Sequence, residues 1–344
     1  MVGNIAYVAS RAKSRRKKLA DLPRMRQLIN QSTDQLIASV SNIGYSEEIN
    51  LYAGRLSGGD LVEAALTHNL ESELSDILSM CNGKIRDIVG IYTSRFEYQN
   101  AKVVFRSVVN DVELSKVANS ILPDLNDINT PWLKIIENSD DLRSAALQMR
   151  RKSFGSELKS LPEDARLSHY EDALDRHYFK HALKSLKGNN PAIKYLRDYV
   201  AMEIDHKNIL NILESSSIGI NPDDFNNLLI SGGKLLPARS FSSIAAGGRS
   251  AMLDILRTSN RFDMAHFEAL LSESENSRSL DPIITWFKER EHKFMKKMSY
   301  LHPISALPIV YYVAMKVQEV NDLRIIVRGR FAGLSEKVLE EHIL

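Results

Sequence analysis

Apolar side chains recur every three or four residues along most of this chain, which is the spacing of one face of an α-helix. The pattern is clearest over residues 61–80, 142–148 and 169–186. Ser or Asp precedes several such segments and Gly or Pro separates them, as is typical of helix ends. The alternation with a period of two that marks strands is almost absent. The sequence therefore predicts an all-α protein.

One helical pattern recurs three times, at a spacing of about 110 residues, which is the scale of a whole structural unit. The tetrapeptide Tyr-Val-Ala-Met begins at Tyr199 and again at Tyr312, and a fainter copy occupies residues 91–94. An asparagine follows nine residues after the first residue of each copy. The three asparagines are Asn100, Asn208 and Asn321. The repetition indicates that one unit was used three times.

The surroundings of the three asparagines predict that they are buried. Residues four apart stack on one helical face, and the positions eight and four before and four after each asparagine are apolar. A buried amide is costly unless its donors and acceptor are paired, so we expect each asparagine to bond to a neighbouring loop. An acid or amide lies three residues before each one. These residues are Glu97, Asp205 and Gln318.

Short helical segments follow each copy and suggest where the units end. They lie at residues 113–122, 222–230 and 334–344, and Ser335 is placed to cap the last of them. The predicted domains are therefore residues 1–125, 126–236 and 237–344. A chain of 344 residues is long enough for three domains of this size.

Composition narrows the class of protein. Cys81 is the only cysteine, which excludes an intramolecular disulfide and fits a reducing, cytoplasmic compartment. The first twenty residues have no apolar core and carry many cations, unlike a secretory signal. The longest apolar stretch, residues 304–315, is too short to span a bilayer and contains Pro308. We expect no membrane-spanning segment.

Positive charge is concentrated at the start of the chain, although the net charge is only +2. Eight cations and one acid occur up to Arg26. We expect most of these cations to line a solvated helix face, and some to form an interface with an acidic partner. The candidate interface residues are Arg11, Lys13, Arg15, Arg16, Lys17 and Lys18. No aromatic residues are interleaved with these cations and no known binding motif accompanies them, so nucleic acid is not an expected partner.

The motifs that could carry chemistry are weak. Residues 231–234, Ser-Gly-Gly-Lys, lack the spaced glycines and the final Ser or Thr of a phosphate loop, and a helix C-cap with a turn is expected there. His177 and His181 have the spacing of a zinc pair, but Tyr178 stands where a metalloprotease helix needs Glu. Cys81 has no activating neighbour in sequence. We predict no catalytic residue, cofactor or metal.

Residues 308–336 resemble the C-terminal signature of the C subunit of the archaeal and bacterial A/V-type rotary ATPases, the counterpart of the d subunit in the vacuolar enzyme. The residues that match are Asn321, Arg324, Gly329, Gly333, Leu334 and Ser335. Asp205 and Asn208 match the middle signature, and residues 7–13 look like the family's opening, with Ser10 in place of a more usual Asn. Resemblance covers the whole length, and the first copy around Asn100 is the most degraded.

The resemblance implies three similar helical domains around a pseudo-threefold axis, arranged as a funnel. It also implies a non-catalytic central-stalk subunit that works as a socket. Its partners would be the central-shaft subunits and the membrane rotor ring of ion-carrying subunits, so that torque links ATP synthesis or hydrolysis to ion transport. Such a protein is peripheral, held at the cytoplasmic face of the plasma membrane through the protein ring.

Two other interpretations remain open at this point. One is a helical repeat scaffold that binds an acidic partner through its basic N-terminal helix. The other is a hydrolase with a site at His177 and His181. A genomic neighbourhood of rotary-ATPase subunits would separate the rotary-ATPase interpretation from the scaffold. Bound zinc, and activity lost on chelation, would support the hydrolase.

Overall fold

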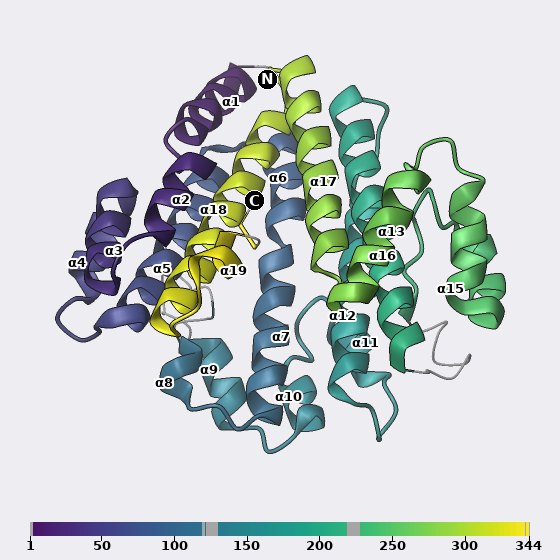
Figure 1. Ribbon diagram of the computed structural model, residues 1–344, viewed down its shortest axis with the longest axis horizontal. Helices are drawn as coiled ribbons and strands as arrows, with labels where there is room; N and C mark the ends of the chain where they lie inside the picture. Colours follow the sequence, from purple (N-terminus) through teal and green to yellow (C-terminus); the bar gives the residue numbers. More distant parts are fainter. Residues whose placement is uncertain (1–2, 119–120, 122–129, 219–227, 341, 344) are drawn as a thin grey trace. The chain divides into compact units, whose positions relative to one another are not determined.

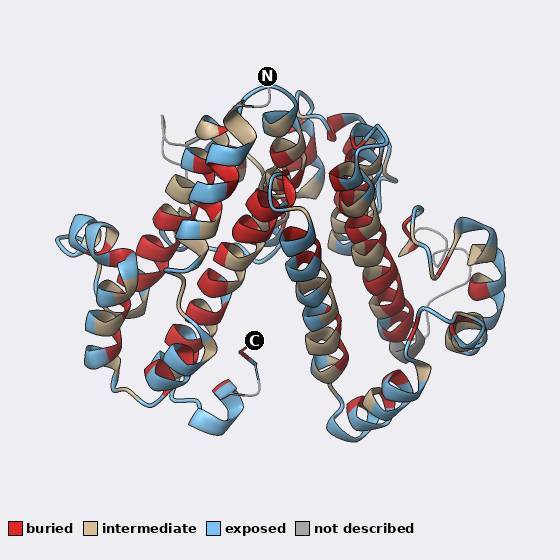
Figure 2. Ribbon diagram, turned by 90° about the horizontal axis from the view of Figure 1, so that it is seen from above, coloured by how far each residue is buried: buried red, intermediate tan, exposed pale blue. Residues whose placement is uncertain are grey.

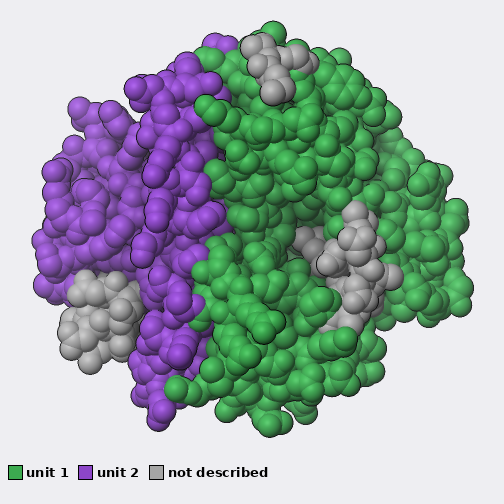
Figure 3. All heavy atoms as spheres, turned by 180° about the vertical axis from the view of Figure 1, so that it is seen from behind, with its two compact units in different colours: residues 1–155, 302–344 green, residues 156–301 purple. Residues whose placement is uncertain are grey.

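The computed structural model describes residues 3–118, 121, 130–218, 228–340 and 342–343 of the chain. Every regular element in these ranges is a helix, which confirms the all-α prediction (Figure 1). The chain divides into two compact units, coloured in Figure 3. Unit 1 comprises residues 1–155 and 302–344, and unit 2 comprises residues 156–301.

The long helices lie where the apolar periodicity predicts them. The segments 61–80, 142–148 and 169–186 correspond to α5 (Gly58–Met80), α10 (Leu142–Gln148) and α12 (Leu167–Ser185). Buried positions run as stripes along the long helices in Figure 2. Two of the three asparagine copies lie on long helices, α13 (Pro191–Ile218) and α18 (Leu307–Phe331).

The first asparagine copy is divided between two helices. It spans α6 (Lys84–Thr93) and α7 (Arg95–Val109), which are separated at Ser94. The Ser94 hydroxyl donates to the carbonyl of Ile91 at 2.7 Å. Such a local bond competes with the helical ladder and favours a break at serine.

Unit 1 is built around α18, which packs against α1 (Gly3–Arg16) and α5. Smaller helices cover the rest of α18 and of α5. They are α2 (Leu22–Ile29), α3 (Thr33–Val40), the π-helical turn η1 (Ser41–Tyr45), α4 (Ser46–Tyr52) and α19 (Glu336–Glu340). The helix α7 packs against α10 and α9 (Thr130–Glu137), and α8 (Leu114–Ala118) lies on α9. Val8, Leu66 and Val310 are fully buried in this core.

Local sequence explains where α18 begins and ends. Pro308 stands in the first turn, where a missing N–H is tolerated. Gly333 has a positive φ of 75° just after the last turn. The N–H of Leu334 donates to the carbonyl of Gly329 at 2.8 Å and that of Gly333 to Arg330 at 3.1 Å. These two bonds form a Schellman motif, which only a residue tolerant of positive φ permits.

Unit 2 is built around α13, which packs against α12, α15 (Phe241–Arg257) and α17 (Asp281–Leu301). The helix α16 (Met264–Ser277) lies on α17. Ile209, Met252 and Phe267 are fully buried in the core. The remaining elements are α11 (Gly155–Lys159), which begins at the last residue of unit 1, and the 3-10 turn η2 (Ala238–Ser240).

The two compact units and the three predicted domains have different boundaries. Unit 1 joins the start and the end of the chain because α18 packs on α1 and α5. The units are defined by contacts between residues, whereas the predicted domains are defined by similarity between sequence segments. The threefold repeat therefore stays a prediction. The predicted boundary at residue 125 and most of the segment 222–230 lie outside the described residues. The first and last predicted short helices correspond to α8 and α19.

Within the described residues, no helix has both the length and the apolar character that a bilayer crossing requires.

Candidate signature sites and charged surfaces

The second asparagine fastens α13 to the loop that follows it. Asn208 is fully buried, and its Nδ2 donates to the carbonyl of Ile230 at 2.8 Å. Its Oδ1 accepts the N–H of the same residue, also at 2.8 Å. One turn along, the Nδ2 of Asn211 donates to the carbonyl of Leu228 at 2.9 Å. The prediction of a buried amide bonded to a loop is therefore confirmed for this copy.

Asp205, three residues before Asn208, binds the backbone at the end of the Ser-Gly-Gly-Lys segment, residues 231–234. The carboxylate of Asp205 accepts the backbone N–H groups of Lys234, Leu235 and Leu236, at 2.8, 3.0 and 3.0 Å. A side chain at Gly233 would overlap with this carboxylate. Successive N–H groups of this kind form an anion cradle, and here the anion belongs to the chain itself. The segment is a turn whose backbone is bound by the Asp205 carboxylate, and a turn is what the sequence predicts there.

Burial and hydrogen bonding act on Asp205 in opposite directions. Burial raises the pKa of this carboxyl group above its ordinary value, and the three backbone donors oppose that rise. Its neighbour His206 stacks on Phe287, with ring centroids 4.0 Å apart. Burial and the nearby Arg290 guanidinium lower the pKa of His206 to about 3. The imidazole is therefore neutral near pH 7, and its Nδ1 lies 2.6 Å from the Glu291 carboxylate.

The first asparagine is also buried, as predicted. Asn100 lies on α7 and is 7% exposed. The acid three residues earlier, Glu97, forms an ion pair with Lys152 at 2.9 Å. The Lys152 ammonium also lies 4.6 Å from the centroid of the Trp132 ring. In this copy the acid therefore joins α7 to the segment after α10, within unit 1.

The prediction for the third asparagine is wrong. Asn321 is exposed, and the next residue, Asp322, is buried instead. The Nε2 of Gln318 donates to the Asp322 carboxylate at 2.7 Å. Val320 and Leu323 are fully buried. The predicted stripe positions four residues on either side of Asn321 are only half-buried, because α18 is covered by α1, α2, α3 and α5 and turns a different face inward.

A buried charged cluster on α18 was not predicted from the sequence. The Lys316 ammonium lies 2.8 Å from the Glu319 carboxylate and donates to the Tyr45 hydroxyl at 2.9 Å. The same hydroxyl donates to Glu319 at 2.8 Å, and the other oxygen of Glu319 accepts the backbone N–H of Ala20 at 2.7 Å. Lys316 and Glu319 face inward among apolar residues. A lysine and a glutamate three residues apart among apolar residues are the sequence signal of this cluster.

Burial fixes the protonation of the tyrosine in this cluster. Burial and the neighbouring Glu319 carboxylate raise the pKa of Tyr45 well above its ordinary value. Tyr45 therefore keeps its proton and serves as a donor to Glu319 while it accepts from Lys316. The cluster joins η1, α18 and the segment after α1 by hydrogen bonds that leave no charge unpaired.

Tyrosine and arginine residues of the predicted signature join α18 to α5. The Tyr312 hydroxyl donates to Glu73 at 2.6 Å. The Nη2 of Arg324 donates to the Thr67 hydroxyl at 2.7 Å, and its Nε lies 3.2 Å from the Glu63 carboxylate. Tyr199, at the matching position of the second copy, is buried on α13. Tyr312 and Arg324 thus hold α18 on α5.

Gly329 allows close packing at the end of α18. A side chain there would overlap with Leu339 of α19, which is almost fully buried. The Gly-x-x-x-Gly-Leu-Ser stretch therefore has two physical roles. Gly329 admits α19, and Gly333 permits the turn between the two helices.

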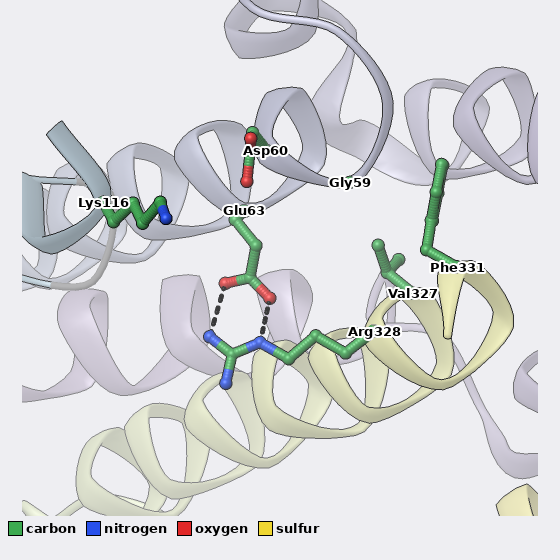
Figure 4. A pocket seen from close by; sticks show the side chains of 7 residues that line it. All are labelled: Gly59, Asp60, Glu63, Lys116, Val327, Arg328 and Phe331. Carbon is green, nitrogen blue, oxygen red and sulfur yellow. Dashed lines mark hydrogen bonds and ion pairs between the residues drawn. The ribbon is translucent and has the colours of Figure 1, made fainter. Parts of the chain in front are cut away.

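A pocket of about 380 Å³ lies beside these residues in unit 1. Glu63 and Arg328 form a two-point ion pair across it, with distances of 2.6 and 3.1 Å (Figure 4). The full lining is Gly59, Asp60, Glu63, Lys116, Val327, Arg328 and Phe331. Acids and cations balance in this lining, and the two charged groups at its centre already satisfy each other.

Half of the predicted interface cations bond within the chain. The Arg15 guanidinium pairs with Glu73 at 2.6 Å and with Asp76 at 3.1 Å. The Arg16 guanidinium lies 4.8 Å from the centroid of the Tyr311 ring, and Lys13 donates to the carbonyl of Pro303 at 3.2 Å. The other three are exposed. They are Arg11, Lys17 and Lys18. These contacts hold α1 on unit 1, and an interface at the exposed cations stays a prediction.

The remaining chemical candidates do not assemble a reactive site. The rings of His177 and His181 stack with centroids 6.4 Å apart, and burial lowers the pKa of His177. Across the described ranges, no three His, Cys, Asp or Glu side chains are grouped so as to hold a metal ion. Cys81 is fully buried, and burial raises the pKa of its thiol to about 11. A thiol of this kind is a poor nucleophile.

The fold and its polar clusters define an all-helical protein, in which buried carboxylates, amides and arginines join long helices to loops and to one another. Its family follows from the sequence as a whole. Residues 8–342 match the model of the ATP synthase (C/AC39) subunit family, and the chain belongs to that family. Members are structural parts of a complex and do not carry the catalytic site.

Named relatives agree with this assignment over nearly their full length. The A-type ATP synthase C subunit of Haloquadratum walsbyi is 28% identical, with 99% of this chain and 98% of that protein covered. The protein of the same name from Haloferax volcanii is 26% identical, with 99% and 97% covered. That from Methanococcoides burtonii is 22% identical, with 99% and 94% covered. The resemblance seen in the signature residues is thereby confirmed.

Proposed function

We propose that this chain is the central-stalk subunit that couples the central shaft of an A/V-type ATP synthase to the membrane rotor ring. It acts as a socket, so that torque links ATP synthesis or hydrolysis to ion transport. The single observation that carries the proposal is the family match over residues 8–342, together with relatives named as the C subunit of A-type ATP synthase. Three similar domains arranged as a funnel around a pseudo-threefold axis belong to the same proposal.

The internal bonding of unit 1 supports a role in transmitting force. The helix α18 is joined to α5 through Tyr312, Arg324 and Arg328, and to η1 through its buried cluster. Hydrogen bonds to charged groups are roughly twice as strong as neutral ones, and buried networks of them rigidify a structure. A part that carries torque needs such rigidity, because a soft part would absorb the rotation.

The proposed partners are the central-shaft subunits and the ring of ion-carrying subunits. Through the ring the chain is peripheral to the membrane, at the cytoplasmic face of the plasma membrane. The exposed cations Arg11, Lys17 and Lys18 of the segment around α1 are candidates for contact with a partner. Because these side chains are positively charged, the expected partner surface is acidic.

Affinity purification from the native membrane tests the proposal. An affinity tag on the full chain is expected to recover the shaft and ring subunits of the ATP synthase after mild detergent extraction, identified by mass spectrometry. Recovery of a tagged chain without any other ATP synthase protein would contradict the proposal. Charge reversal of Arg11, Lys17 and Lys18 is expected to lower recovery at moderate salt if these cations form the interface.

A further inference from the structure

The last turns of α17, in unit 2, carry a basic face that ends in exposed apolar residues. Lys293, Lys296, Lys297 and Tyr300 are spaced three, four and seven residues from the first, so they share one helical face. All four are exposed, while the opposite face of the helix buries Met295 and Met298. Lys293, Lys296, Lys297, Tyr300 and Leu301 are called the α17 face from here on.

The lysines of this face are directed at solvent. Among the residues that the structure describes, Lys293 has one ion pair, with Glu289 of the preceding turn at 2.8 Å, and both side chains are exposed. No ion pair of Lys296 or Lys297 occurs among the described residues. Arg15 and Arg16 of α1 differ, because their contacts hold that helix in place. The charge of Lys296 and Lys297 is therefore available for an outside surface, and that of Lys293 is shared only with an exposed neighbour.

The tip of the face is apolar and exposed. Tyr300 is 64% exposed and Leu301 is 58% exposed, the first of these being the most exposed large apolar side chain described. An amphipathic ring beside lysines is typical of segments at the headgroup level of a membrane. Lysine is also a flexible, compact cation without the planar fork that favours specific pairing with protein carboxylates. Both features favour a lipid surface over an acidic protein groove.

We propose that the α17 face binds the anionic phospholipid headgroups of the membrane beside which the complex works. The three lysines meet lipid phosphates, and Tyr300 and Leu301 insert at the headgroup level. The inference rests on the proposed function, which brings this chain close to a membrane. It assigns the chain a lipid contact of its own, in addition to its contact with the protein ring.

Vesicle sedimentation of the purified full chain tests this proposal. The chain is expected to bind vesicles of phosphatidylcholine and phosphatidylglycerol in equal amounts, and not vesicles of phosphatidylcholine alone. Changing Lys293, Lys296 and Lys297 to Gln is expected to weaken that binding by about a hundredfold, since each lysine near an anionic surface contributes about fivefold. Added salt is expected to weaken the wild-type binding, because exposed charges are screened.

A matched variant separates this face from net charge. Changing Lys180, Lys184 and Lys187 to Gln removes the same charge from exposed positions elsewhere in unit 2 and is expected to leave binding close to wild type. A second variant, Tyr300→Ser with Leu301→Ser, is expected to lower the binding that remains at high salt. Circular dichroism of each variant confirms that it is folded.

Three results would overturn the proposal. The first is equal binding to anionic and neutral vesicles, and the second is equal loss in the two lysine variants. The third is no vesicle binding by any form, together with loss of the α17 variant from the purified complex, which would assign the face to an acidic protein. Failure of the proposed function is distinct, since it appears as absence of other ATP synthase proteins from the wild-type purification.

Discussion

The side-chain amide of Asn208 lies fully buried between α13 and the segment before Ser231, where it both donates to and accepts from the backbone of Ile230. These two bonds replace the ones that water would make to an exposed loop backbone. Asn208 therefore stabilises the fold mainly because the N–H and the carbonyl of Ile230 would be unpaired without it. A buried polar group that loses its partner costs about 1–3 kcal/mol.

Asn208→Leu is accordingly expected to lower the free energy of unfolding by about 1–3 kcal/mol, because the N–H and carbonyl of Ile230 lose their partners. Asn321→Leu is the matched control, since it makes the same change at the corresponding position of the third copy, where the residue is exposed. Surface changes of that kind usually stay within about 0.5 kcal/mol. Urea denaturation of both variants measures the difference. Equal destabilisation by the two would contradict the description of Asn208.

Cys81 offers a second test at the same scale. Burial raises the pKa of its thiol to about 11, so at pH 8 almost none of it is thiolate. Alkylation by iodoacetamide is expected to be slow in the native chain at pH 8 and fast after denaturation. Because this is the only cysteine, mass spectrometry reads one site directly. Rapid alkylation of the folded chain would show that the thiol is neither buried nor protonated.

At the scale of elements, α18 is a central helix of unit 1, where it packs against both α1 and α5. It is covered on several sides, and it places charged residues inside. Lys316 and Glu319 are 8% and 3% exposed as side chains, and both bond to Tyr45. A buried pair of this kind contributes little net stability, but removing one partner leaves an unpaired charge in the interior. The cluster therefore specifies how α18 meets η1 more than it stabilises the fold.

A double-mutant cycle on this pair tests that description. Lys316→Met or Glu319→Leu alone is expected to cost about 3–5 kcal/mol, because either leaves a buried charge without its partner. The double variant is expected to recover most of that loss, since no charge remains. Thermal and urea unfolding of the four proteins give the coupling free energy. Additive losses would mean that the two residues do not form a buried pair.

The same helix shows how far periodicity predicts a structure. It correctly predicts the long helices α5, α12 and α13, because apolar spacing depends only on local geometry. It fails for Asn321, since the rotation of α18 about its axis depends on the helices that cover it. Tyr45 and Lys316 lie 271 residues apart, and no periodic signal joins them. Periodicity also does not predict that the Asp205 carboxylate accepts three backbone N–H groups, although it places Asp205 in the repeat.

At the scale of the whole molecule, the chain is a non-catalytic member of an ATP synthase subunit family, and its buried polar groups connect helices and loops within the chain. The signature residues Asp205, Asn208 and Arg324 hold helices and loops in place. Signature residues of this kind maintain the shape of the chain, and the proposed coupling role requires a part that keeps its shape. The proposed role in coupling is therefore a property of the assembled complex.

Ion pumping driven by ATP in membrane vesicles tests that role most directly. Vesicles are prepared from cells that lack the chain and from the same cells with the gene restored, and ATP hydrolysis and ion uptake are measured together. The account predicts that hydrolysis by the soluble head persists without the chain while ATP-driven ion uptake is lost, and that the restored gene returns it. Undiminished ATP-driven uptake in the absence of the chain would contradict a coupling role.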